Sequence, residues 1–289
     1  MSTFRAVGLR GNWLNGWLAA IGVTVLLPGT RLSWSSDVIP TASFEHEGDL
    51  ADDLAGAIPS EEDINDLTIA RHHSKSAVEL PRRVDPDAFA DRARLARASR
   101  DGSLETTITD LVVEDGGWCA HAPFDPPVPK GLTLHERLST VRAAIDGDVH
   151  SAIEDSLCGR ARRSQGNGLG FDALRFASGV QAQADVAIDP IVELACFYGT
   201  LLLPVRGGGS TIRQRGWTQR TLRRHAFAWP VWQPPLGRWA IDGLLDIAWS
   251  GQPLTALKVW GISGLFGSVA QQPRSRSDVS RAYASERLW

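Results

Sequence analysis

Residues 188–203, IDPIVELACFYGTLLL, decide the fold of this chain. Asp is a favourable N-cap residue and Pro is tolerated in the first turn of a helix, so the sequence predicts a helix that begins at Pro190 and ends before Pro204. Glu193 is its one charge past the start, and apolar residues fall on every side of it. A helix without a polar face is buried, so we expect this one at the centre of the core.

A second apolar helix is predicted near the N-terminus, from a cap at Asn12 to the turn at residues 28–29. Residues 18–28 (LAAIGVTVLLP) align without gaps on residues 194–204 (LACFYGTLLLP), and six of the eleven pairs are identical. After each proline, a glycine-containing turn leads to an extended segment that contains Arg and ends in Trp. After the first of these segments, a further strand is predicted at 41–45. The similarity indicates either a duplicated helix–strand unit or two leucine-rich helices that resemble each other by composition.

Charge is unevenly divided along the 289 residues, of which 43% are hydrophobic and 22% charged, as is typical of a globular protein. Residues 1–155 contain 14 Lys/Arg and 25 Asp/Glu, a formal charge of −11, and residues 156–289 contain 16 and 8, a charge of +8. A basic half suits a polyanionic partner. The alternative is that the two sets of charges neutralise each other within one domain.

We expect an α+β fold that is helix-rich, with small mixed or antiparallel sheets and two central apolar helices. The expected organisation is an acidic α+β part at residues 1–115, a proline-rich connection, a basic α+β part at 132–267 that contains the core helix, and a mobile tail at 268–289. Pro230 would confine the predicted strand 226–232 to a sheet edge. The helix predicted within 236–249 is amphipathic, with an apolar side made by Trp239, Ile241, Leu244, Leu245 and Ile247.

Several catalytic motifs are absent. The sequence has no Gly-Lys dipeptide, no His followed by Asp, no H-E-x-x-H and no G-x-S-x-G. These absences argue against a P-loop NTPase, a His-Asp metal nuclease, a zinc protease and a standard esterase. Cys119, Cys158 and Cys196 are odd in number and lack a C-x-x-C pair, so we expect neither a disulfide framework nor a zinc site, in keeping with a reducing cytoplasm.

The N-terminus resembles a signal peptide without its cleavage site, because two arginines precede the apolar run 17–27, which ends in Pro-Gly-Thr-Arg. Neither apolar run reaches the roughly 18 uncharged residues of a membrane span. We expect a cytoplasmic protein without cofactor or metal.

Two clusters of polar residues have the composition of a catalytic or metal site. Cys119, His121 and Asp125 could serve as nucleophile, base and orienting acid, or could be polar residues of a proline-rich loop. The pair His72-His73 beside Glu61, Glu62 and Asp66 could bind a metal, but these acidic residues suit a solvated face of the helix predicted at 60–70, which opens with a Ser60-x-x-Asp63 capping arrangement. We expect no catalytic residue and no metal ligand in either.

Arginines flank the core helix on both sides and interleave with tryptophans. The segment GNGLG at 166–170 could form a nest of backbone N–H groups for a phosphate, or a simple structural turn. The guanidinium group can bind phosphate through two hydrogen bonds, and Trp can stack on unpaired bases. The predicted nucleic-acid-binding residues are Arg160, Arg162, Arg163, Asn167, Arg206, Arg213, Arg215, Trp217, Arg223 and Arg224.

An opening Leu-x-Gly and four short stretches resemble subunits encoded in type I-G (formerly I-U) CRISPR–Cas loci. The stretches are 17–22 (WLAAIG), 31–34 (RLSW), 167–172 (NGLGFD) and 204–207 (PVRG). The resemblance implies a non-catalytic, nucleic-acid-binding component of an antiviral surveillance complex, with guide RNA or target DNA and other CRISPR–Cas subunits as partners.

Two other functions stay open on the sequence. One is an enzyme that acts on a small anionic, phosphorylated substrate held by the same arginines, with His121 or His225 as the base. The other is a structural adaptor whose basic half docks onto acidic protein partners.

Overall fold

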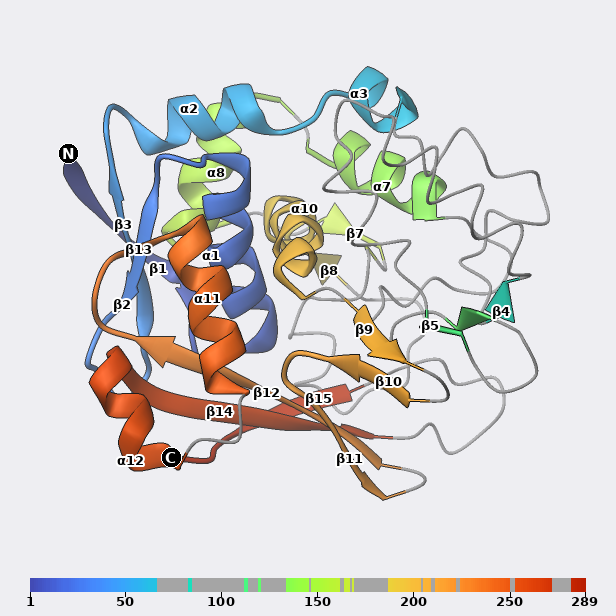
Figure 1. The fold of residues 1–289 in the computed structure, drawn as a ribbon. Helices are drawn as coiled ribbons and strands as arrows, with labels where there is room; N and C mark the ends of the chain where they lie inside the picture. Colours follow the sequence, from blue (N-terminus) through green and yellow to red (C-terminus); the bar gives the residue numbers. More distant parts are fainter. Residues whose placement is uncertain are drawn as a thin grey trace.

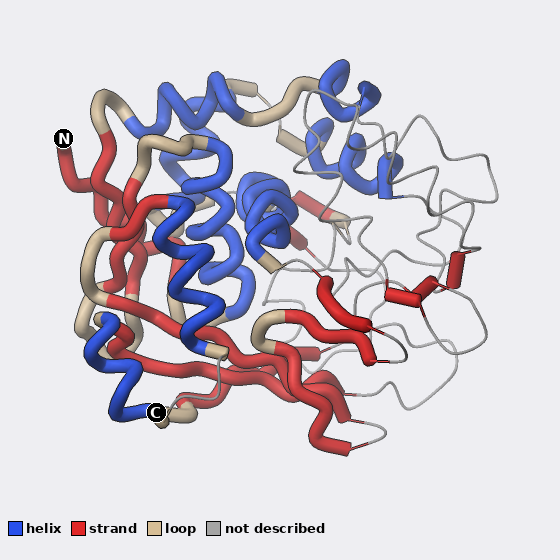
Figure 2. The backbone as a smooth tube through the Cα atoms, in the orientation of Figure 1, coloured by secondary structure: helices blue, strands red, loops and turns tan. Residues whose placement is uncertain are grey.

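The computed structural model describes residues 1–66, 83–84, 112–113, 119–120, 134–145, 147–161, 164–166, 168, 187–203, 205–208, 211–221, 224–249, 253–271 and 282–289. In these residues, helices and small sheets gather around two central helices (Figures 1 and 2). Every strand pair that the structure describes is antiparallel. The predicted α+β fold is therefore confirmed.

The two central helices are α1 (Leu14–Leu26) and α10 (Pro190–Gly199), which continues into the short 3₁₀ helix η1 (Thr200–Leu202). Both are buried along almost their whole length, as their lack of a polar face predicts. The predicted cap of α10 is present, because the Asp189 carboxylate accepts hydrogen bonds from the backbone N–H groups of Ile191 at 3.0 Å and Val192 at 3.3 Å. In contrast, α1 begins at Leu14, and Trp13 at its N-cap position makes no side-chain capping bond.

Helices α1 and α10 cross with their backbones in contact. A Cβ atom built on Gly22 would lie 1.8 Å from the carbonyl oxygen of Ala195, and one built on Gly199 would lie 2.2 Å from that of Leu18. The two contacts pair residues in opposite order along the chain, so the helices run antiparallel. Glycine is required at both positions because no side chain fits between the backbones.

The N-terminal sheet has the order β1-β3-β2-β13 and lies on the left of Figure 1. It contains β1 (Ser2–Arg10), which the sequence did not predict, and the predicted β2 (Arg31–Trp34) and β3 (Thr41–His46). Its fourth strand, β13 (Leu236–Gly237), comes from the C-terminal half and pairs with β2. The two expected parts of the chain thus share a sheet and one hydrophobic core.

The second large sheet, along the bottom of Figure 1, has the order β11-β12-β14-β15. Its strands are β11 (Trp217–Thr221), β12 (Arg224–Trp232), β14 (Ile262–Gln271) and β15 (Ala282–Arg287). In the tail predicted at 268–289, the first four residues continue β14 and residues 282–287 pair with β14 as β15, while residues 272–281 lie outside the described residues. The Ser- and Arg-rich composition of this segment concealed its strand pairing.

Pro230 does not place β12 at the sheet edge, since β12 lies between β11 and β14. Its register with β11 runs only from Arg224 to Phe227, so Pro230 lies beyond that pairing while it still faces Leu265 of β14. The Pro230 carbonyl accepts a hydrogen bond from Nε1 of Trp17 at 2.8 Å and so points away from β14. The nitrogen of a strand residue points to the same side as its carbonyl, so the missing N–H removes no bond to β14.

Three buried indole groups connect β12 to the N-terminal elements. Besides Trp17, Nε1 of Trp229 donates to the carbonyl of Gly11 at 2.7 Å, and Nε1 of Trp232 donates to that of Leu32 at 2.8 Å. Each indole therefore buries a large apolar surface and also satisfies its one donor.

Further helices cover the core. Near the top of Figure 1 lie α2 (Leu50–Ala57), α3 (Glu61–Asp66), α7 (Leu134–Ala143) and α8 (Val149–Leu157). The predicted capping arrangement at the start of α3 is confirmed, because the Asp63 backbone N–H donates to Oγ of Ser60 at 3.1 Å and the Ser60 N–H donates to Oδ2 of Asp63 at 2.8 Å. Among the described residues, no helix has the length and apolar character that a bilayer crossing requires.

Helix α11 (Arg238–Ala248) packs on α1 and is followed by α12 (Leu254–Leu257) and the 3₁₀ helix η2 (Lys258–Trp260). Its apolar side buries Ile241, Leu244 and Leu245, as expected. The prediction that Trp239 belongs to this apolar side was wrong, because 74% of the residue is exposed and its ring lies beside the Arg238 guanidinium group. The remaining described strands are β4 (Arg83–Val84), β5 (Val112–Val113), β6 (Cys119–Ala120), β7 (Ser164–Gln165), β8 (Ala187–Ile188), β9 (Val205–Gly208) and β10 (Thr211–Gln214).

Candidate functional site

Arg215 is a structural residue and not a surface cation. Its side chain is almost fully buried, its Nε donates to Oδ1 of Asp246 at 2.8 Å, and its Nη1 bonds the Leu202 carbonyl at 2.9 Å and the Asp242 carboxylate. Burial alone would lower the pKa of Arg215, but the hydrogen bonds with Asp246 and Asp242 raise it. The charge is therefore neutralised inside the fold, and we leave Arg215 out of the nucleic-acid interface.

The other described residues of the predicted set lie in two parts of the chain. One is Arg160 at the end of α8, and the other is the group on the strands that follow α10. Arg160 follows α8, is exposed, and donates from Nε to Oδ1 of Asp155 at 3.1 Å, a bond that raises the pKa of Arg160. Arg206 and Arg213 are direct partners in the β9–β10 hairpin. Two further residues occur at the first positions of strands, Trp217 in β11 and Arg224 in β12. Arg162, Arg163, Asn167 and Arg223 lie outside the described residues.

Helix α10 separates the two groups. Asp189 at its N-terminal end lies against Ser156 of α8, close in sequence to Arg160, whereas β9 follows the C-terminal end of α10 through η1. A ten-residue helix is about 15 Å long. The basic residues therefore lie at the two ends of the buried helix and do not form one compact cluster.

Gly168, which with Gly166 is described in the predicted phosphate nest at 166–170, lies against a carboxyl group of the protein itself. Glu193 is fully buried in α10, and a Cβ atom built on Gly168 would lie 2.9 Å from its Oε2. Gly168 is also buried and has a positive φ of 47°. At Gly168 this arrangement favours the structural turn over the phosphate nest, because the Glu193 carboxyl group already occupies the space against the glycine.

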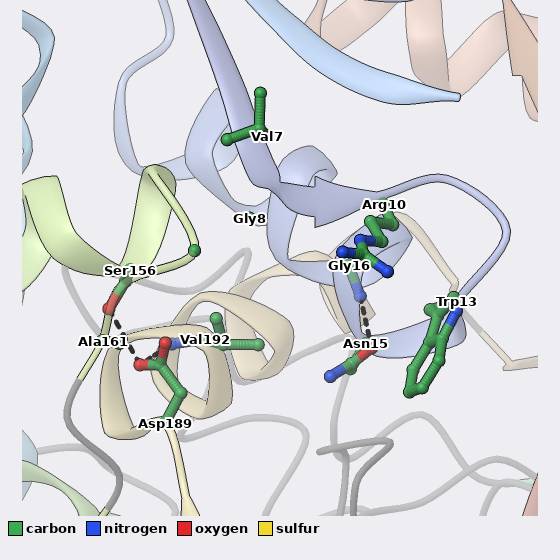
Figure 3. Close-up of a pocket in the computed structure, with 11 residues that line it drawn as sticks. Val7, Gly8, Arg10, Trp13, Asn15, Gly16, Ser156, Ala161, Asp189 and Val192 are labelled. Atoms are coloured by element: carbon green, nitrogen blue, oxygen red, sulfur yellow. Dashed lines mark hydrogen bonds between the residues drawn. The ribbon is translucent and has the colours of Figure 1, made fainter. Parts of the chain in front are cut away.

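A cavity of about 280 Å³ lies between the end of β1, the first turn of α1, the C-terminal end of α8 and the first turn of α10 (Figure 3). We call it the Arg10 cavity. Its polar and aromatic lining includes Arg10, Trp13, Asn15, Ser156 and Asp189. The Ser156 hydroxyl donates to Oδ1 of Asp189 at 2.9 Å, so one end of the lining presents a buried carboxylate with a hydroxyl beside it.

Glycines allow the backbones around the Arg10 cavity to approach one another. A Cβ atom on Gly8 would lie 2.1 Å from the carbonyl oxygen of Ser156, so β1 passes directly against the end of α8. Gly159 ends α8 with φ of +71°, a conformation that favours glycine. Gly16 would place a Cβ 2.5 Å from the carbonyl oxygen of Arg10, so the first turn of α1 lies against the end of β1.

Arg10 and Trp13 are not among the residues that the sequence predicts for a site. Arg10 is exposed and makes no ion pair with any residue that the structure describes, and Trp13 is half-buried. The sequence signal that could have indicated Arg10 and Trp13 is their position on either side of Gly11 and Asn12, directly before an apolar helix. In the sequence, this arginine stands out only as part of a signal-peptide pattern.

Comparison with known protein families and with curated proteins gave no match for this chain.

The catalytic and metal candidates of the sequence lie mostly beyond the described residues. Only Cys119 of its cluster is described, as the first residue of β6, and His225 lies in β12. Within the described part, Asp49, Asp52 and His150 approach each other, with His150 Nε2 3.3 Å from Oδ1 of Asp52. Asp49 and Asp52 are exposed and His150 is half-buried, and their contacts connect α2 to α8, which accounts for them without a metal.

One hydrogen-bonded series, Thr30, His46 and Asp53, has the composition of a catalytic triad. Oγ1 of Thr30 lies 2.8 Å from Nδ1 of His46, and Nε2 of His46 lies 2.7 Å from Oδ2 of Asp53. Thr30 is fully buried, so its hydroxyl cannot reach a substrate. The series connects the turn before β2 to β3 and α2 and is structural.

Proposed function

We propose that this chain is a non-catalytic, nucleic-acid-binding subunit of a CRISPR–Cas surveillance complex, which contacts the backbone of guide RNA or target DNA in the cytoplasm. Its partners would be that nucleic acid and other CRISPR–Cas subunits. The free thiols of Cys158 and Cys196 agree with a reducing compartment.

The register of the β9–β10 hairpin is the observation that carries the proposal. Arg206 and Arg213 are direct partners across this antiparallel pair. Like charges at directly opposed positions disfavour strand pairing, and a phosphate between them would replace that repulsion with attraction. The sequence around them is rich in glycine, and the half of the chain that contains them has a charge of +8.

The distance between the two basic groups suits one extended strand. The length of α10, about 15 Å, corresponds to roughly five phosphates of a stacked strand at about 3.4 Å per nucleotide. A single strand of that length would reach both Arg160 and the hairpin. Contacts of this kind position a strand but do not read its sequence.

Fluorescence anisotropy with labelled 20-nucleotide RNA and DNA, at a series of salt concentrations, tests the proposal. We expect binding that weakens with salt, and a slope that is shallower by about 0.7 for each single-strand phosphate that Arg206→Ser/Arg213→Ser no longer neutralises. The matched control, Arg5→Ser/Arg31→Ser, removes two exposed arginines from the N-terminal sheet and should bind as the parent does. Salt-independent binding, or equal slopes for both double variants, would refute the proposal.

Membership of a CRISPR–Cas complex is tested separately by purification of the tagged chain from its host. Sequencing of the bound RNA and mass spectrometry of the bound proteins should identify guide RNA and CRISPR–Cas subunits, and their association should require Arg206 and Arg213. Recovery of the chain without either class of partner contradicts this part of the proposal.

A further inference from the structure

We infer that the Arg10 cavity binds one phosphorylated nucleotide unit of a single strand, with its phosphate at Arg10, its base against Trp13 and its sugar towards Ser156 and Asp189. The inference rests on the proposed function and names a site that the arginines of the sequence did not indicate. The unit could be the end of an oligonucleotide or a free nucleotide, since both present the same chemistry.

The size of the cavity suits this ligand. Its volume of about 280 Å³ is near the lower end of small-molecule sites, roughly 300 Å³, where a ligand is enclosed on most sides. A duplex cannot enter a space of this size, whereas one unstacked nucleotide can. Recognition of single strands by proteins commonly involves such displaced bases.

The charges of the lining give the ligand an orientation. Arg10 supplies a cation with no carboxylate partner among the described residues, next to the first turn of α1, which contains no acidic side chain. The N-terminal end of a helix favours an anion; Trp13 at the N-cap position makes no side-chain bond there, and Oδ1 of Asn15 accepts from the Gly16 N–H at 2.7 Å. Asp189 lies on the other side of the cavity (Figure 3), where its carboxylate would repel a phosphate. The phosphate therefore belongs at the Arg10 end.

Aromatic and oxygen-bearing side chains complete the recognition. Trp13 is one of the lining residues and lies on the same side of the cavity as Arg10 in Figure 3, where its indole could stack on a base. At the other side, the hydroxyl of Ser156 and the carboxylate of Asp189 are oxygen atoms that can accept hydrogen bonds from sugar hydroxyls. Stacking tolerates every base, so we expect little base preference.

The cavity also lies next to one of the predicted arginines, Arg160. Gly159 and Ala161 line it, and Arg160 between them is exposed. A strand with one nucleotide in the Arg10 cavity would pass close to the backbone of Arg160, whose guanidinium group is bound to Asp155 in this structure. From there the strand would continue towards the hairpin at the other end of α10.

Isothermal titration calorimetry of the full chain tests the inference with AMP, adenosine, and eight-nucleotide RNA with or without a 5′-phosphate. We expect AMP to bind and adenosine to bind at least tenfold more weakly. Arg10→Ser and Trp13→Leu should each weaken AMP by about fivefold or more, the range of one stacking or phosphate interaction. Ala161→Leu fills the cavity without a change of charge and should weaken AMP equally, whereas Arg5→Ser, on the same strand as Arg10, should not.

The different ligands in the titration distinguish a strand terminus from a free nucleotide. They also distinguish failure of this inference from failure of the proposed function. Tighter binding of the 5′-phosphorylated RNA than of AMP supports a strand terminus as the ligand, and equal binding supports a free nucleotide. Undetectable AMP binding, or AMP affinity unchanged in Arg10→Ser, Trp13→Leu and Ala161→Leu, overturns the inference even if the Arg206/Arg213 variant shows that the proposed function holds. Unfolding curves of the variants exclude loss of folding as the cause.

Discussion

Gly22 and Gly199 determine how closely the central helices approach. We predict that Gly22→Ala lowers the free energy of unfolding by about 3 kcal/mol, the upper part of the range for overpacked cores, because its Cβ would lie 1.8 Å from a backbone oxygen that cannot move alone. Chemical denaturation measures the change. Gly243→Ala in α11 is the control: its Cβ meets nothing within 4 Å, so the variant should be more stable by up to about 1 kcal/mol. Similar losses of stability in both variants would contradict the close approach of the helices.

Arg215 gives a second prediction at this scale. Arg215→Met should lower the free energy of unfolding by about 3 kcal/mol, because it leaves Asp242 and Asp246 without their cation, although both carboxylates keep some access to water. Arg160→Met removes an exposed ion pair and should leave the denaturation midpoint unchanged. If Arg215→Met instead weakened RNA binding with no loss of stability, Arg215 would belong to the interface after all.

The N-cap of α8 predicts a pH dependence for a single element. Hydrogen bonds from the Ser151 hydroxyl and backbone lower the pKa of Asp148 from its ordinary value of 3.8. The stability that the ionised cap contributes is therefore present above pH 3.8 and is lost as the pH falls through the lower pKa of the folded state. Asn also caps helices but does not titrate, so Asp148→Asn should show a flatter dependence of the urea midpoint between pH 5 and pH 2. Parallel curves for the two proteins would count against this contribution.

Local signals predicted the elements whose ends are fixed by their own residues. Asp189 and Pro190 identified the start of α10, and Ser60 with Asp63 identified that of α3. Elements that depend on distant partners were missed: β1 lacks a clear alternation, and β15 exists because β14 offers an edge. The candidate site was likewise predictable only where local sequence signals it. The arginine-rich segments were visible, but the burial of Arg215 and the cavity beside Arg10 depend on tertiary packing that no local pattern encodes.

At the scale of the whole molecule, the expected boundary between acidic and basic parts is not a structural boundary. α1 packs on α10, β13 pairs with β2, and residues of both parts join one core. We predict that residues 1–130 and 131–289, expressed separately, are each insoluble or unfolded, and that co-expression restores a folded complex. Circular dichroism and size-exclusion chromatography would show this. A folded, monomeric fragment from either half would restore the two-domain interpretation.

The indole bonds to β12 impose an order of events during synthesis. Leu32 and Trp232 are 200 residues apart, so at roughly 5–20 residues per second the ribosome needs about 10–40 s to deliver the partner of the N-terminal sheet. For most of that interval the apolar α1 has been made but α10 has not, and β12 is complete only at its end. The nascent chain therefore exposes an apolar, aggregation-prone helix for longer than most folding steps take. The yield of folded protein in a cell should rise with the supply of chaperones that bind such segments.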